Sequence, residues 1–153
     1  MFTQAAAQLF PPVAEVLASD LSIEDKVLKV VEIAMTVLSK TPSLPAYIIG
    51  EINQAPERAA QLLETAQRLK SGGTLKRMMS VLQTQIDAQV TNGMMRAISA
   101  QEFLTNLLAL CIFPFATKPM LRVILGVDDA NFEQFLAARA KDIPRFFLDA
   151  LRP

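Results

Sequence analysis

The stretch FLTNLLALCIFPF, which runs from Phe103 to Phe115, constrains the fold more than any other part of the sequence. It contains no charged residue, and Thr105 and Asn106 are its only polar side chains. A surface helix of a globular protein presents an apolar stripe about 100° wide, with polar residues on the opposite face. Apolar residues around the whole circumference therefore indicate a helix that is covered on more than one side.

A membrane could cover such a helix, but this stretch is too short to cross one. At about 1.5 Å of rise per residue, a helix of this length spans roughly 20 Å, whereas a hydrocarbon core is about 30 Å thick. Lys118 and Pro119 then end the apolar run. The N-terminus, MFTQAAAQLFPP, lacks the positively charged first region of a secretory signal. We therefore expect a soluble, cytoplasmic chain with no membrane partner.

The composition excludes several classes of function. The 153 residues fit one domain, 1–153, and 15 basic residues balance 15 acidic ones, which argues against a broad nucleic-acid-binding surface. Without histidine and with a single cysteine, the chain cannot form a usual zinc site or use histidine for acid–base catalysis. We expect no enzyme activity, no metal and no cofactor. Cys111 is expected to be an inert core thiol, and Glu51 to pair with Arg58 or another base.

Hydrophobic periodicity predicts helices along the chain and no strands, so the expected fold class is all-α. Helices are expected over 2–18, from 22 to about 40, between Ser43 and Pro56, over 56–69, over 75–92, from 99 to about 115, over 120–125 and over 128–151. Expected N-terminal caps are Ser22, Ser43, a Ser99–Glu102 capping box and Asp128. Expected stops are Asn92-Gly93 and Gly126. Prolines are expected to bend or restart the first helix at Pro11-Pro12 and to kink the last at Pro144.

Two parts of the sequence together resemble TetR-family transcriptional regulators. LSKTPSLPAYIIGEINQAPER (38–58) resembles the place where one helix of that family ends at an Asn/Thr-Pro turn, followed by a short helix and a Glu-x-x-x-x-Pro step. RAISAQEFLTNLLALCIFPFATKPMLRVILG and FEQFLAARAKDIPRFFLDALRP resemble the last two long helices of the family and its Leu-Arg-Pro-like ending. The resemblance covers nearly the whole chain, in order and with matching spacings.

This resemblance implies a C-terminal regulatory domain of a transcriptional repressor, built as a multi-helix bundle. The family's helix-turn-helix domain precedes this region, and Met1 begins about where that domain would end, so DNA is expected as a partner only through that absent domain. The implied function is homodimerisation and the sensing of a small hydrophobic or amphipathic effector. Effector binding would tilt the first helix and so set the spacing of two recognition helices, with Pro11-Pro12 as a hinge.

The resemblance also places an effector pocket around the helix over 75–90, Tyr47 and part of the helix that follows Ser99. Methionine adapts to irregular cavities, and polar groups among apolar ones orient ligands. The expected ligand-binding residues are Tyr47, Met78, Met79, Leu82, Gln83, Asn106 and Leu110. The alternative for each is ordinary core packing, and for Asn106 a hydrogen bond to a neighbouring helix.

The two most apolar helices are expected to pair with their symmetry mates in a four-helix dimer interface, which would be self-complementary. The expected interface residues are Phe103, Leu104, Leu107, Leu108, Ile112, Phe115, Phe132, Phe135, Leu136, Ile143 and Phe147. On the alternative interpretation, Phe103, Leu107, Leu110 and Phe113 belong to the core of a single chain. Two other functions stay open, a helical scaffold without ligand and a carrier of lipid or another hydrophobic molecule.

Overall fold

The computed structural model describes residues 2–58, 61 and 74–153. Every regular element in these residues is a helix, which confirms the predicted all-α class. The predicted helix over 56–69 lies outside the described residues except at 56–58 and 61. The named helices are α1 (Phe2–Ala18), α2 (Ile23–Lys40), α3 (Leu44–Gln54), α5 (Thr74–Thr91), α6 (Ala100–Ala116), α7 (Lys118–Leu125) and α8 (Asp129–Ala150).

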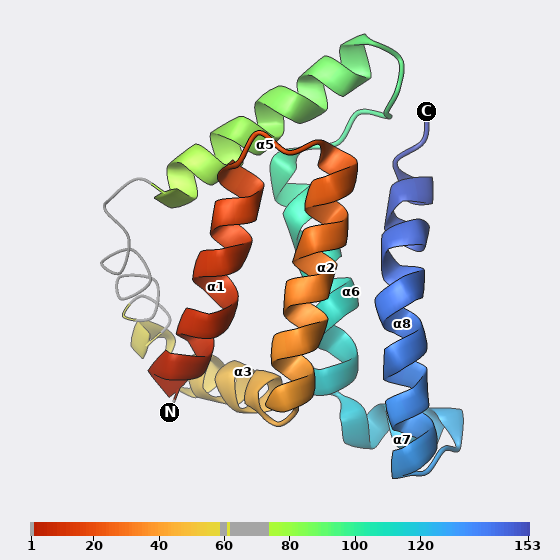
Figure 1. Ribbon diagram of the computed structural model, residues 1–153. Coiled ribbons are helices and arrows are strands. Elements are labelled where there is room, and N and C mark those ends of the chain that lie inside the picture. The colour runs from red at the N-terminus through yellow and green to blue at the C-terminus, as the bar shows by residue number, and fades with distance from the viewer. Residues whose placement is uncertain (1, 59–60, 62–73) are drawn as a thin grey trace.

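Helix α2 lies at the centre of the arrangement (Figure 1). It packs against α1, with which it forms an antiparallel pair, and against α6 and α8 on its other sides. At one end of this group α5 crosses α1, and at the other end α3 lies across the ends of α1 and α6. The short α7 follows α6 at the same end as α3. A crossing helix thus covers each end of the bundle, α5 at one end and α3 at the other.

Polar side chains begin three of the helices as the sequence predicts. The Ser22 hydroxyl accepts a hydrogen bond from the Asp25 amide (3.1 Å). The Ser99 hydroxyl accepts one from the Glu102 amide (3.1 Å), which is the serine half of the predicted capping box. The Asp128 carboxylate accepts one from the Asn131 amide (2.8 Å). Each bond satisfies one of the amides that a first turn leaves without a helical partner.

The predicted cap at Ser43 is wrong. Ser43 already has helical backbone angles (φ −82°, ψ −12°), and its side chain makes no capping hydrogen bond. A capping residue normally has extended backbone angles, which aim its hydroxyl back at the first amides. The start of α3 instead depends on Pro45 in its first turn, as predicted, where proline loses no helical hydrogen bond.

Two glycines end helices as predicted. Gly93 (φ +71°) and Gly126 (φ +66°) adopt the left-handed conformation that L side chains rarely take. The Met94 amide then donates to the Gln89 carbonyl (2.9 Å) and the Val127 amide to the Arg122 carbonyl (3.1 Å). These bonds span five residues and satisfy carbonyls of the last turn, as in a Schellman motif.

Prolines inside the helices do not divide them. Helix α1 continues through Pro11 and Pro12, so the predicted restart does not occur, and α8 continues through Pro144. Proline removes one amide and leaves the carbonyl four residues earlier without its usual donor. Val13 and Leu17, which follow the proline pair, are buried, and their packing holds the C-terminal half of α1 in place.

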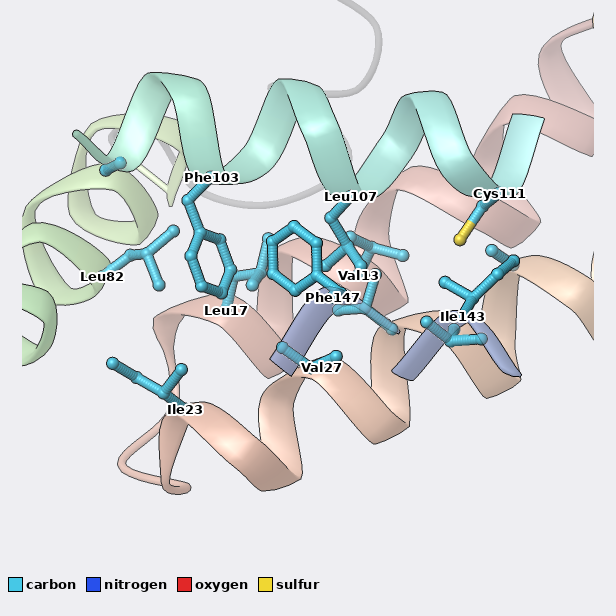
Figure 2. Close-up of a cluster of buried hydrophobic side chains, with 14 of the residues drawn as sticks. Val13, Leu17, Ile23, Val27, Leu82, Phe103, Leu107, Cys111, Ile143 and Phe147 are labelled. Atoms are coloured by element: carbon cyan, nitrogen blue, oxygen red, sulfur yellow. The ribbon is translucent and has the colours of Figure 1, made fainter. Parts of the chain in front are cut away.

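The core joins side chains from five helices (Figure 2). Phe103 and Leu107 point from one face of α6 toward α1, α2 and α8. The rings of Phe103 and Phe147 meet edge to face, with their centroids 4.9 Å apart and an interplanar angle of 88°. Leu17 of α1 and Leu82 of α5 are also fully buried, so α1 is held between α2 and α5.

Within the described residues, no single helix is long and apolar enough to cross a membrane. Helices α6 and α7 meet the requirement together, by length and composition, as a pair bent by 80°. This bend falls at Thr117, which ends α6 and precedes α7.

Candidate functional site

An apolar pocket opens where α1, α2, α3 and α6 meet. Its volume is about 130 Å³, close to that of an engineered apolar cavity of about 150 Å³ that stays dry and binds benzene or xenon. All its lining side chains are apolar: Leu9, Phe10, Leu38, Leu44, Pro45, Ile48, Ile49 and Ile112. A site without a hydrogen-bond donor or acceptor on its side chains favours a small apolar guest.

Local structure on α3 positions one wall of this pocket. Pro45 is buried, and the Leu44 amide donates to the Thr41 carbonyl (3.0 Å), which closes the turn between α2 and α3. Near the other end of α3, Glu51 pairs with Arg58, as the sequence predicts. The helix is therefore tied down at both ends, with its apolar side chains between them.

The opposite wall belongs to α1 and lies beside its two prolines. Leu9 and Phe10 line the pocket directly before Pro11 and Pro12. Because neither proline has an amide proton, the carbonyls of residues 7 and 8 lack their usual helical donors. The N-terminal half of α1 is thus joined to the rest of the helix by two fewer hydrogen bonds. It can bend more easily than an uninterrupted helix.

A second hollow, the α6–α8 groove, lies on another side of α6 and has a volume of about 500 Å³. Phe113 and Phe146 stand in it with half or more of their surface exposed, at 50% and 66%. The lining residues are Arg96, Ile98, Asn106, Ala109, Leu110, Phe113, Arg139, Phe146, Phe147, Ala150 and Leu151. This groove combines exposed aromatic surface with two guanidinium groups.

Arg139 connects the two helices of the groove. Pro114 has no amide proton, so the Leu110 carbonyl four residues earlier lacks a helical donor. Nη2 of Arg139 donates to that carbonyl at 2.7 Å, and the guanidinium lies 5.8 Å from the centroid of the Phe135 ring. Nε of Arg139 is buried and has no hydrogen-bond partner among the residues described. Sequence analysis missed this residue, although a proline at position 114 signals a free carbonyl at 110.

The structure does not bring the seven predicted ligand-binding residues together. Asn106 and Leu110 line the α6–α8 groove, whereas Tyr47 is 55% exposed on α3. Met78 and Leu82 are buried in the core, and Met79 packs partly against it. None of the seven lines the apolar pocket. Helix α5 was expected to form a wall of the pocket but crosses the far end of α1, and α3 forms that wall instead.

Gln83 has a structural role in this arrangement. Its Oε1 accepts a hydrogen bond from the Ala100 amide at 2.7 Å, and its Nε2 donates to Asp87 at 2.9 Å. The Ala100 amide lies in the first turn of α6 and has no helical partner. Gln83 therefore joins α5 to the start of α6.

The predicted interface residues divide into two groups. Six are covered by their own chain and belong to its interior: Phe103, Leu107, Phe115, Phe132, Ile143 and Phe147. The other five are half-buried: Leu104, Leu108, Ile112, Phe135 and Leu136. The first group corresponds to the alternative interpretation for Phe103 and Leu107, which placed them in a single-chain core. Phe113, which that alternative also placed in the core, is instead exposed in the groove.

Cys111 is fully buried, and burial raises the pKa of its thiol to about 12, against a smaller opposing effect of the Arg139 charge. The thiol therefore stays protonated and unreactive, as the sequence predicts. We expect Ellman's reagent at mildly alkaline pH to modify it at least about 100-fold more slowly in the folded protein than in guanidinium chloride. Stoichiometric reaction of the native protein within minutes would contradict this burial.

The chain matches no protein-family model, no curated protein and no solved structure. A function must therefore be inferred from the chain's own features. Two of these features are hollows that another molecule could enter, the apolar pocket beneath α1 and the aromatic groove between α6 and α8.

Proposed function

We propose that this chain is an effector-sensing regulatory domain that works as a homodimer, in the manner of the C-terminal domain of a TetR-like transcriptional regulator. The observation that carries the proposal is the apolar pocket, because α1 forms one wall of it through Leu9 and Phe10. A molecule in this pocket contacts α1 on one side and α3 and α6 on the other. The bound molecule would therefore affect the angle of α1 relative to α3 and α6.

The energy available from such a ligand is sufficient for a switch. Burying roughly 120 Å² of apolar surface contributes about 3 kcal/mol at 25 cal/mol per Å². If the ligand realises this gain in only one position of α1, it shifts the equilibrium between two positions by about a hundredfold. In a protein where a DNA-reading domain precedes α1, the tilt of α1 sets the separation of the two recognition helices.

The size of the pocket favours an effector over a lipid. A volume of about 130 Å³ accommodates a ring the size of benzene but not a long acyl chain. Native mass spectrometry of the purified protein distinguishes these two functions. A stoichiometric co-purified lipid would favour the lipid-carrier alternative and would contradict an effector pocket of this size.

Dimerisation is proposed to use the α6–α8 groove. Phe113 and Phe146 expose apolar surface there. A second copy that covers the groove would bury the two rings. The same face of both copies would then meet, which suits a two-fold axis.

Benzene is the probe for the apolar pocket. We expect it to bind to the wild-type protein and to change the methyl NMR signals of Leu9 and Ile48. The substitution Ile112→Phe fills the pocket and is expected to raise the benzene dissociation constant by at least about tenfold, because the added ring occupies volume that the guest needs in a pocket of about 130 Å³. The dissociation constant comes from a titration followed by those signals.

Ile112→Val is the matched control, because it keeps the pocket apolar and open. This variant is expected to bind benzene within about threefold of the wild-type affinity, since it removes one methylene group from one wall. Equal affinities of the Ile112→Phe variant and the wild-type protein, or signal changes confined to residues outside the pocket, would remove the observation on which the proposed function depends.

A further inference from the structure

Among the residues that the structure describes, Lys26 is the charged residue that is fully buried, with an exposed fraction of zero. Its Nζ donates to the Leu17 carbonyl at 2.8 Å and to Oε1 of Gln85 at 2.6 Å. Nε2 of Gln85 donates in turn to the Leu21 carbonyl at 2.9 Å. One lysine and one glutamine therefore join the end of α1, the turn that follows it, the first turn of α2, and α5.

This arrangement compensates for the burial of a charge. Burial lowers the pKa of Lys26 from its usual value, and the nearby Asp20 charge opposes that effect. A buried ammonium group is tolerated only when its donors are satisfied. The Leu17 carbonyl lies in the last turn of α1, where carbonyls lack helical partners and where the helix dipole favours a positive charge.

The point on α1 that Lys26 contacts gives this hydrogen bond a role in the proposed switch. The pocket residues Leu9 and Phe10 precede the proline pair, and the Leu17 carbonyl follows it. At about 1.5 Å per residue, Leu17 lies roughly 10 Å along the helix from Phe10. The middle of α1 thus lines the pocket and lacks two helical hydrogen bonds, whereas its C-terminal end is held by hydrogen bonds.

We propose that Lys26 is the pivot of α1: it fixes the C-terminal end of the helix against α2 and α5. A ligand in the apolar pocket then swings only the N-terminal half, instead of shifting the whole helix. This inference rests on the proposed function, because it concerns the response of α1 to a guest in that pocket. Lys26 acts as a positioning residue and does not contact the guest.

The variants Lys26→Met and Lys29→Met form a matched pair on α2. Methionine roughly keeps the length of the side chain and removes its charge, and Lys29 is exposed and pairs with Glu32 at the surface. We expect amide hydrogen exchange at residues 14–21 to become at least about tenfold faster in the Lys26 variant, because the end of α1 loses its anchor. In the Lys29 variant the exchange rates are expected to stay within about threefold of wild type.

Benzene titrations followed by amide NMR test the swing itself. In the wild type and the Lys29 variant, shift changes within α1 are expected at the amides of residues 8–10 and not beyond Val13. In the Lys26 variant they are expected to extend through Leu17 to Leu21, with benzene affinity within about threefold of wild type because the pocket lining is intact. Should Lys26→Met not fold, Gln85→Leu removes one of the two acceptors and is expected to show the same changes at smaller amplitude.

The outcomes separate the pivot from the pocket. Shift changes along all of α1 in the wild type would show a rigid displacement and overturn the pivot, as would identical behaviour of the Lys26 and Lys29 variants. If benzene does not bind at all, the proposed pocket fails and the pivot of its switch fails with it. Faster exchange at residues 14–21 would in that case leave Lys26 with an anchoring role only.

Discussion

Replacing Phe147 by alanine is expected to lower the free energy of unfolding by about 3–5 kcal/mol. The Phe147 ring is 4% exposed and meets the Phe103 ring edge to face at 4.9 Å (Figure 2). Truncation leaves a cavity between α6 and α8 that close-packed neighbours cannot fill without strain. Urea unfolding followed by circular dichroism should show a lower midpoint with an unchanged slope.

The adjacent residue provides the control for this substitution. Phe146 is 66% exposed, so Phe146→Ala is expected to change the stability of a single chain by less than about 1 kcal/mol. A loss of stability that arises inside one chain does not depend on protein concentration, whereas a loss of stability at a contact between two copies does. Unfolding at a low and a high protein concentration therefore distinguishes the two positions. Equal, concentration-dependent losses would place Phe147 at the interface and not in the core.

Helix ends were predictable because their causes are local. Ser22, Asp128 and Gly126 act on amides or carbonyls within five residues, so a short window of sequence contains the whole interaction. Ser43 shows the limit of that reasoning. Its residue type suits a cap, but the turn from α2 into α3 gives it helical backbone angles, and residue type alone does not determine those angles.

The faces of α6 were less predictable, because apolar residues surround this helix. Periodicity cannot decide between the side of Phe103 and Leu107, which is core, and the side of Leu110 and Phe113, which lines the open groove. The neighbours of α6 decide it, and these come from parts of the chain far away in sequence. The location of the apolar pocket has the same origin, since it depends on where α3 lies relative to α1.

Lys26 could have been found in the sequence. Ile23, Val27, Val30 and Val31 follow the spacing of one buried helical face, and Lys26 falls on the same face. A lysine within an apolar stripe needs acceptors inside the protein, which is a signal for a polar contact between helices. The partners themselves, the Leu17 carbonyl and Gln85, could not be named, because they depend on how α1 and α5 cross α2.

Replacing Phe146 by aspartate is expected to weaken the proposed homodimer by at least about 100-fold. The substitution removes the exposed ring of Phe146 from the α6–α8 groove and puts a carboxylate there, which dimerisation would take out of water. The lost apolar contact and the desolvated charge together cost about 3 kcal/mol or more, which corresponds to a factor above 100 in the dissociation constant. Sedimentation velocity over a range of concentrations measures the change.

Leu28→Asp is the control, because Leu28 is an exposed apolar residue on α2 (45%) and does not line the groove. It introduces the same charge on a different face, so the dissociation constant is expected to stay within about threefold of wild type. Arg139→Met is expected to weaken the dimer less than Phe146→Asp, since it leaves Phe113 and Phe146 in the groove and adds no buried charge. A wild-type protein that sediments as a monomer at micromolar concentration would contradict the proposal that a second copy covers the α6–α8 groove.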